Sequence, residues 1–157
     1  DTTTRELIGF HSTTNPTRLW LENVIRGLFM LRDDIPRFLV SDRDGIFGDW
    51  LSEFLDECYG VRLYRTPPQT PNCNAFAERM VLSFRSEVLD HRIIFGTSDL
   101  MRLLTDYGAY YNERRCHQSL GHEAPKARFN VLKQTKVHRY RKKRFVEGLY
   151  VDYELAA

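Results

Sequence analysis

The chain has 157 residues, of which 42% are hydrophobic and 13% aromatic, and its formal net charge is +2. This length and composition suit one globular domain, and no apolar run approaches the roughly 18 residues that a membrane-spanning helix needs. The N-terminal DTTTRELIGFH lacks the features of a signal peptide, and three cysteines without CxxC spacing indicate a reducing, intracellular setting.

The apolar periodicity alternates between the strand type and the helix type along the chain. Asn15 and Pro16 indicate the start of one helix, Gly60 the end of another and Ser98 the cap of a third. In chain order, the predicted elements are a strand over 5–12, a helix over 16–31, a strand over 38–42, a helix over 49–58, a strand over 61–66, a loop over 67–74, a helix over 75–91 and a helix from Ser98. This order predicts an α/β sandwich with some parallel pairing.

The strand over 38–42 opens the segment FLVSDRDGIFG, in which an apolar run ends in two acids and a glycine. Asp42, at the predicted strand end, is a candidate for a metal ligand. Asp44 and Gly45 are most simply a polar turn after a buried strand. The segment alone does not decide between a metal site and a turn.

A second acid, Glu78, lies on the predicted helix that follows the proline- and asparagine-rich loop, with 35 residues between it and Asp42. Arg85 follows seven residues later, almost two helical turns, and therefore shares a helix face with Glu78. An acid at a strand end, an acid on a helix and a cation on the same face are typical of phosphoryl transfer. Asn74, four residues before Glu78, either contacts DNA near the scissile phosphate or caps the loop.

Four segments in this order resemble the catalytic core of DDE transposases and retroviral-type integrases, most closely that of bacterial insertion-sequence transposases. FLVSDRDGIF is similar to the segment with the family's second acid, which corresponds to Asp42. TPPQTPNCNAFAER is similar to the mobile loop and the third acid, Glu78. Arg85 corresponds to the basic residue two turns beyond, and YYNERRCHQSLGHEAP (110–125) resembles the tail that follows the core.

The resemblance implies a ribonuclease-H-like mixed sheet flanked by helices, and DNA strand transfer during integration and recombination. It also implies two Mg²⁺ or Mn²⁺ ions, with Asp42 and Glu78 as catalytic residues and metal ligands. Hard divalent ions prefer such carboxylate ligands. The implied partners are the element ends and target DNA, in a homo-multimer when full length, in the bacterial cytoplasm or on the nucleoid.

The family's first aspartate has no counterpart among these residues. Asp1 lies only 41 residues before Asp42 and, from its context, belongs to a turn. We therefore expect the first aspartate and the first two strands of the core to precede this chain. With only two carboxylates to hold the metal ions, we expect low or absent activity from these 157 residues alone.

The chain is expected to divide into a partial integrase-like core over 1–125 and a basic β hairpin or small β module over 126–157. The segment KQTKVHRYRKKR (133–144) has seven Lys or Arg and no acid, and an alternating, strand-like segment with an expected turn at Glu147 and Gly148 follows it. Such a surface suits contact with the DNA backbone, although a charge-balanced, solvated hairpin is the alternative. The candidate DNA-binding residues are Asn74, Arg85, Arg139, Arg141, Lys142 and Lys143.

Two other functions remain open. One is a catalytically inactive transposase remnant that still binds DNA or a full-length partner. The other is a ribonuclease-H-like nuclease, which shares the fold and the metal ions but lacks a tail like that of residues 110–125.

Overall fold

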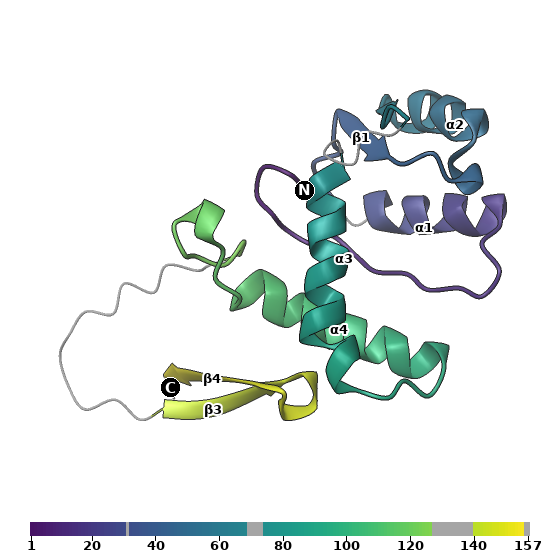
Figure 1. The fold of residues 1–157 in the computed structure, drawn as a ribbon. Helices are drawn as coiled ribbons and strands as arrows, with labels where there is room; N and C mark the ends of the chain where they lie inside the picture. The colour runs from purple at the N-terminus through teal and green to yellow at the C-terminus, as the bar shows by residue number, and fades with distance from the viewer. Residues whose placement is uncertain (31, 69–73, 127–139, 156–157) are drawn as a thin grey trace. The chain divides into compact units, whose positions relative to one another are not determined.

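The computed structural model describes residues 1–30, 32–68, 74–126 and 140–155 (Figure 1). The chain forms two compact units, one of Thr13–Ser83 and one of Asp1–Ser12 with Phe84–Ala157. Each unit has its own small sheet, so the fold is mixed α/β. The single ribonuclease-H-like sheet remains a prediction, because the described strands form two separate two-stranded sheets.

The first unit, Thr13–Ser83, is built around a β-α-β segment. Its described elements are α1 (Arg18–Met30), β1 (Phe38–Ser41), η1 (Gly45–Phe47), α2 (Asp49–Tyr59), β2 (Arg62–Arg65) and the beginning of α3 (Ala75–Glu87). Strands β1 and β2 pair in parallel, with Phe38 opposite Arg62 and Ser41 opposite Arg65. Parallel strands need a crossover connection, which α2 supplies, and the predicted parallel pairing is confirmed.

The core of this unit forms because α1 and α2 each present an apolar stripe at helical spacing. Leu51, Leu55 and Val61 are fully buried in it. The remaining members of the cluster are Leu21, Ile25, Phe29 and Phe54. Helix α2 ends at Gly60, whose φ of 65° is left-handed and whose N–H donates to the Asp56 carbonyl, which confirms the predicted stop.

The predicted helix over 16–31 is confirmed as α1, but its predicted N-cap is wrong. Thr17 accepts a hydrogen bond from the Trp20 N–H at Oγ1 (3.2 Å), so the helix begins two residues later than Asn15 and Pro16 indicate. A threonine hydroxyl fills the same capping role as an asparagine side chain. Leu31, at the predicted end, lies outside the described residues.

The predicted strand over 5–12 is also wrong, because this segment has no strand pairing. The Asn112 side chain takes the place of a strand neighbour. Its Oδ1 accepts from the Leu7 N–H and its Nδ2 donates to the Leu7 carbonyl, both at 2.8 Å. Arg5, with a φ of 64°, interrupts the extended backbone. Asp1 forms the predicted turn and accepts from the N–H groups of Thr3 and Thr4.

The second unit consists of Asp1–Ser12 and the chain from Phe84 onward. Its described elements are the end of α3, η3 (Leu89–His91), α4 (Thr97–Glu113), η4 (Gln118–Leu120), β3 (Tyr140–Phe145), η5 (Val146–Gly148) and β4 (Tyr150–Leu155). The fully or almost fully buried side chains of Leu103 and Tyr107 on α4 lie in its core, together with Val88.

None of the described helices is long and apolar enough to cross a membrane.

Two predicted helix boundaries in this unit need correction. The helix predicted over 75–91 ends at Glu87, because Val88 leaves the helical conformation and a short 3-10 turn follows. Helix α4 begins at Thr97 with Gly96 as its N-cap, rather than with Ser98. Asp99 explains the difference, since its Oδ2 accepts from the Phe95 N–H (3.1 Å) and closes the first turn.

The C-terminal hairpin has the expected form. Strands β3 and β4 are antiparallel, with Tyr140 opposite Leu155 and Phe145 opposite Tyr150 (Figure 1). The turn falls at Glu147 and Gly148, as predicted, and both have positive φ. The hairpin packs on α4, where Tyr110 stacks on Tyr150 with ring centroids 4.3 Å apart.

Candidate functional site

Asp42 is exposed and lies immediately after β1, where the parallel ladder ends. One of its carboxylate oxygens accepts from the Asp44 N–H (3.0 Å), and Asp44 in turn accepts from the Ile46 N–H (3.0 Å). Asp44 therefore caps the η1 turn, as its turn interpretation predicted. Asp42 sits on a strand end whose following turn holds its side chain in place.

Arg43 also fixes this strand end, and the sequence interpretation missed it. Its Nε donates to the Thr66 carbonyl (2.8 Å), while the Thr66 N–H donates to the Ser41 carbonyl (2.9 Å). The residues flanking Asp42 are thus tied to the carboxyl end of β2. In the sequence, Arg43 is a cation between two acids at a predicted strand end. This pattern is equally consistent with a solvated side chain.

Glu78 is exposed in the first turn of α3, and Asn74 lies immediately before that helix, half-buried. The first turn of a helix favours negative charge, because its free N–H groups carry partial positive charge. The position of Asn74 is one where an asparagine commonly caps a helix. Both interpretations of Asn74, as a cap and as a DNA contact, stay open.

Asp42 and Glu78 both belong to the unit Thr13–Ser83. Within the described part of the chain, no three His, Cys, Asp or Glu side chains are grouped so that they could hold a metal ion. The two acids are nevertheless chemically suited to one, since Mg²⁺ is commonly held by one or two carboxylates together with water and substrate phosphates.

Arg85 lies in the last turn of α3 and belongs to the other unit. Its Nε is 3.8 Å from Asp90 Oδ1, and the two side chains are 72% and 57% exposed. Such a loose surface pair contributes little stability. The guanidinium therefore remains accessible to an anionic ligand.

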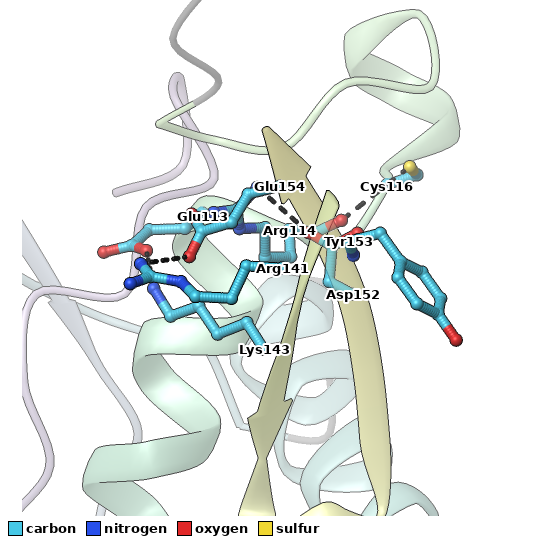
Figure 2. A network of polar contacts seen from close by, with 8 residues as sticks. All are labelled: Glu113, Arg114, Cys116, Arg141, Lys143, Asp152, Tyr153 and Glu154. Atoms are coloured by element: carbon cyan, nitrogen blue, oxygen red, sulfur yellow. Dashed lines mark hydrogen bonds and ion pairs between the residues drawn. The ribbon is translucent and has the colours of Figure 1, made fainter. Parts of the chain in front are cut away.

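Two of the predicted DNA-binding residues on β3 lie among acids (Figure 2). Arg141 donates to Glu154 Oε1 (3.2 Å), and Lys143 is 3.7 Å from Glu113. Arg114, at the end of α4, joins Asp152 and Glu154, each at 2.9 Å. The Arg141 hydrogen bond is the main reason that the pKa of Glu154 lies below its ordinary value, and the charges of Lys143 and Arg114 act in the same direction.

Lys142 alternates with these residues and is exposed. Arg139 lies outside the described residues. The role of Arg114 was not predicted, although an arginine pair that closes a tyrosine-rich helix (YYNERR) was visible in the sequence.

The second arginine of that pair, Arg115, forms a largely buried network with Glu87. Its Nε and Nη2 donate to the Glu87 carboxylate at 2.5–3.1 Å, and the Tyr107 hydroxyl donates to Glu87 Oε2 (3.0 Å). Burial, followed by the charge of Glu87, raises the pKa of Tyr107. The network joins the end of α3 to the end of α4 and has a structural role.

In a comparison with known protein families, residues 59–125 match the family described as integrase core domain. The matched segment contains Asn74, Glu78 and Arg85, whereas Asp42 and the hairpin lie outside it. A search of curated proteins found no match. Residues 59–125 are thus similar to the integrase core domain family.

Proposed function

We propose that the chain takes part in metal-dependent DNA strand transfer, as part of a transposase or integrase core with a ribonuclease-H-like arrangement. The observation that carries the proposal is the integrase core match over the segment that presents Glu78 in the first turn of α3. Asp42, the other proposed metal ligand, is exposed at the carboxyl end of β1 and belongs to the same unit as Glu78.

Asp42 and Glu78 are the residues that would hold the divalent cations. When bound, such ions stabilise charge on the attacking and leaving oxygens of the phosphodiester. The turn at Asp44 and the Arg43–Thr66 hydrogen bond keep the Asp42 carboxylate in one place, which reduces the cost of arranging it for reaction.

Asn74 and Arg85 are proposed to contact the DNA backbone. Arg85 is largely exposed and only loosely paired, so a phosphate can replace Asp90 as its partner. Phosphate contacts of this kind position DNA without selecting its sequence. We propose the same for the basic hairpin.

Metal binding to the 157-residue chain tests the proposal directly. Mn²⁺ should broaden the NMR signals of residues around Asp42 and Glu78, and Asp42→Asn or Glu78→Gln should abolish the broadening. Asp44→Asn is the matched control, because it keeps an oxygen that can cap the η1 turn and should leave Mn²⁺ binding unchanged. If Mn²⁺ broadens the signals of Asp42→Asn and Glu78→Gln as strongly as those of the unmodified chain, the assignment of Asp42 and Glu78 as metal ligands is refuted.

Strand transfer is then measured with a labelled DNA end and a target plasmid in Mg²⁺ or Mn²⁺. Product that disappears in Asp42→Asn and Glu78→Gln, but not in Asp44→Asn, supports catalysis by this site.

A second candidate function is a non-catalytic transposase relative that binds DNA. The observation in its favour is that the described residues bring together no group of three potential metal ligands. DNA binding without Mn²⁺ binding, and without strand transfer at any metal concentration, would establish this alternative.

A further inference from the structure

The β3–β4 hairpin has two chemically different faces. Side chains alternate along a strand, and residues opposite each other in an antiparallel pair share a face. The register therefore places Arg141 with Glu154, Lys143 with Asp152 and Phe145 with Tyr150 on one face. We call this the inner face, because Phe145 and Tyr150 pack on Tyr110 of α4.

Charge on the inner face is balanced. Arg114, Arg141 and Lys143 are matched by Glu113, Asp152 and Glu154, through the ion pairs described above (Figure 2). A polyanion that approached this face would have to displace the acids from their partners. The inner face is therefore a poor DNA-binding surface, although it contains two of the predicted DNA-binding residues.

The other, outer face carries Lys142 opposite Tyr153 and Arg144 opposite Val151. Lys142 and Arg144 are exposed, and neither has an acidic partner within the described part of the chain. Tyr153 is 62% exposed, and Figure 2 shows its ring directed away from Arg114 and the two acids that Arg114 binds. This face combines two cations that have no acidic partner among the described residues with an aromatic ring that is largely exposed.

We infer that the outer face of the hairpin, formed by Lys142, Arg144 and Tyr153, binds single-stranded DNA. The inference rests on the proposed function in that DNA is the substrate, but it requires no catalysis. It adds Arg144 and Tyr153 to the DNA-binding residues and removes Arg141 and Lys143.

The geometry of a strand supports this ligand. Lys142 and Arg144 are two residues apart, so their Cα atoms are about 7 Å apart along β3. Phosphates of one DNA strand recur about every 3.4 Å along a duplex axis, so the two cations can contact different phosphates. An exposed aromatic ring beside such cations provides a surface on which an unpaired base can stack.

The preceding segment, 127–139, adds to the positive charge by its sequence. It contains Arg128, Lys133, Lys136 and Arg139 and no Asp or Glu.

The test compares charge-matched double variants of the two faces. Lys142→Gln/Arg144→Gln removes two charges from the outer face, and Arg141→Gln/Lys143→Gln removes two from the inner face. Binding of a fluorescein-labelled oligothymidine to the 157-residue chain is followed by anisotropy over a range of salt concentrations. EDTA is present, so that metal binding and catalysis play no part.

For single strands, each phosphate contact contributes about 0.7 to the slope of log K against log salt. The outer-face variant should therefore show a slope shallower by about 1.4. When the salt is raised from about 50 to 200 mM, the ratio of its affinity to that of the unmodified chain should therefore rise about sevenfold. The inner-face variant should keep the original slope of log K against log salt. It should unfold at a lower temperature, because Glu113 and Glu154 each lose a cationic partner.

Tyr153 provides an independent check. Tyr153→Ala should weaken binding at least about fivefold, the lower end of the range for a base stacked on an aromatic side chain, whereas Tyr153→Phe should not. An equal or larger loss of slope in the inner-face variant would overturn the assignment of the face. Unchanged binding in Tyr153→Ala, or tighter binding of duplex than of single-stranded DNA, would overturn the assignment of the ligand.

The proposed function and this inference can fail separately. Asp42→Asn should bind the oligothymidine like the unmodified chain, because Asp42 belongs to the other unit. Strand transfer with unchanged binding in the outer-face variant would refute the inference and leave the proposed function intact. Oligothymidine binding that depends on the outer face, together with Mn²⁺ broadening that persists in Asp42→Asn and Glu78→Gln, would refute the proposed function and leave the inference intact.

Discussion

The network of Glu87, Arg115 and Tyr107 allows a stability prediction to be worked from its geometry. Arg115→Gln removes the contacts of Nε at 3.0 and 3.1 Å and of Nη2 at 2.5 Å to the Glu87 carboxylate. The Tyr107 hydroxyl then becomes the main partner of a carboxylate whose side chain is only 23% exposed. The substitution therefore leaves a mostly buried charge with too few partners.

The expected cost follows from that partial burial. Removing one partner of a fully buried pair costs about 3–5 kcal/mol, and a hydrogen bond to a charged group contributes about 1.5–3 kcal/mol. Because both side chains here are about a quarter exposed, water recovers part of the loss. We expect the free energy of unfolding to fall by about 2–3 kcal/mol.

Urea unfolding followed by far-UV circular dichroism measures this change, with Arg85→Gln as the control. Arg85 is 72% exposed and 3.8 Å from its acid, so its substitution should cost less than about 0.5 kcal/mol. Tyr107→Phe and the double variant complete a thermodynamic cycle, which should show coupling between Tyr107 and Arg115 through their shared carboxylate. A cost for Arg115→Gln no larger than that of the control would refute the view that Glu87 depends on Arg115.

Two further predictions concern pH and the core of the other unit. Burial, and then the charge of Arg115, lower the pKa of His117 from 6.5; the unfolded chain thus binds the proton more readily, and stability should fall as the pH drops from 6.5 through the lower folded pKa. In His117→Gln, the urea midpoint should depend less on pH over that range. A midpoint that falls as steeply as in the unmodified chain would show that another group causes the pH dependence. Leu55→Ala, at a fully buried position of α2, should cost about 2–5 kcal/mol, whereas Leu19→Ala, at a position 66% exposed on α1, should cost far less. Tryptophan fluorescence in urea measures both, because Trp20 and Trp50 lie in this unit, and equal shifts in the two variants would show that Leu55 contributes no more to the core than the exposed Leu19.

The catalytic and the non-catalytic hypotheses differ in whether the chain brings together enough carboxylates to hold a metal ion. Asp42 and Glu78 are accessible, and the integrase core match covers the segment that carries Glu78. Two carboxylates can hold a metal ion together with waters and a phosphate. Measured metal affinity in the presence and absence of DNA would therefore separate the two readings more directly than a search for activity.

Several elements could be predicted from the sequence because their causes are local. Gly60 stops α2 since only a residue that tolerates positive φ continues the chain there. The alternation in the C-terminal segment, with Glu147 and Gly148 between its halves, specified the hairpin. The position of Asp42 after an apolar run likewise placed it at a strand end.

Other features depended on partners far along the chain. The segment over 5–12 alternates like a strand, but Asn112, 105 residues after Leu7, satisfies the Leu7 backbone in place of a second strand. The sequence also did not indicate that the Glu87 carboxylate accepts hydrogen bonds from both Arg115 and Tyr107. Long-range hydrogen bonds of this kind leave no periodic pattern.

The hairpin separates the two kinds of information most clearly. Its sequence determined that two sets of side chains alternate, because successive residues of a strand point to opposite faces. Only the tertiary structure decided which set is neutralised, because α4 places Arg114 and Glu113 against one face and not the other. Arg141 and Lys143 are chemically equivalent in the sequence to Lys142 and Arg144. Their electrostatic difference arises from Glu154 on the facing strand and from Glu113 and Arg114 at the end of the helix that packs beside them.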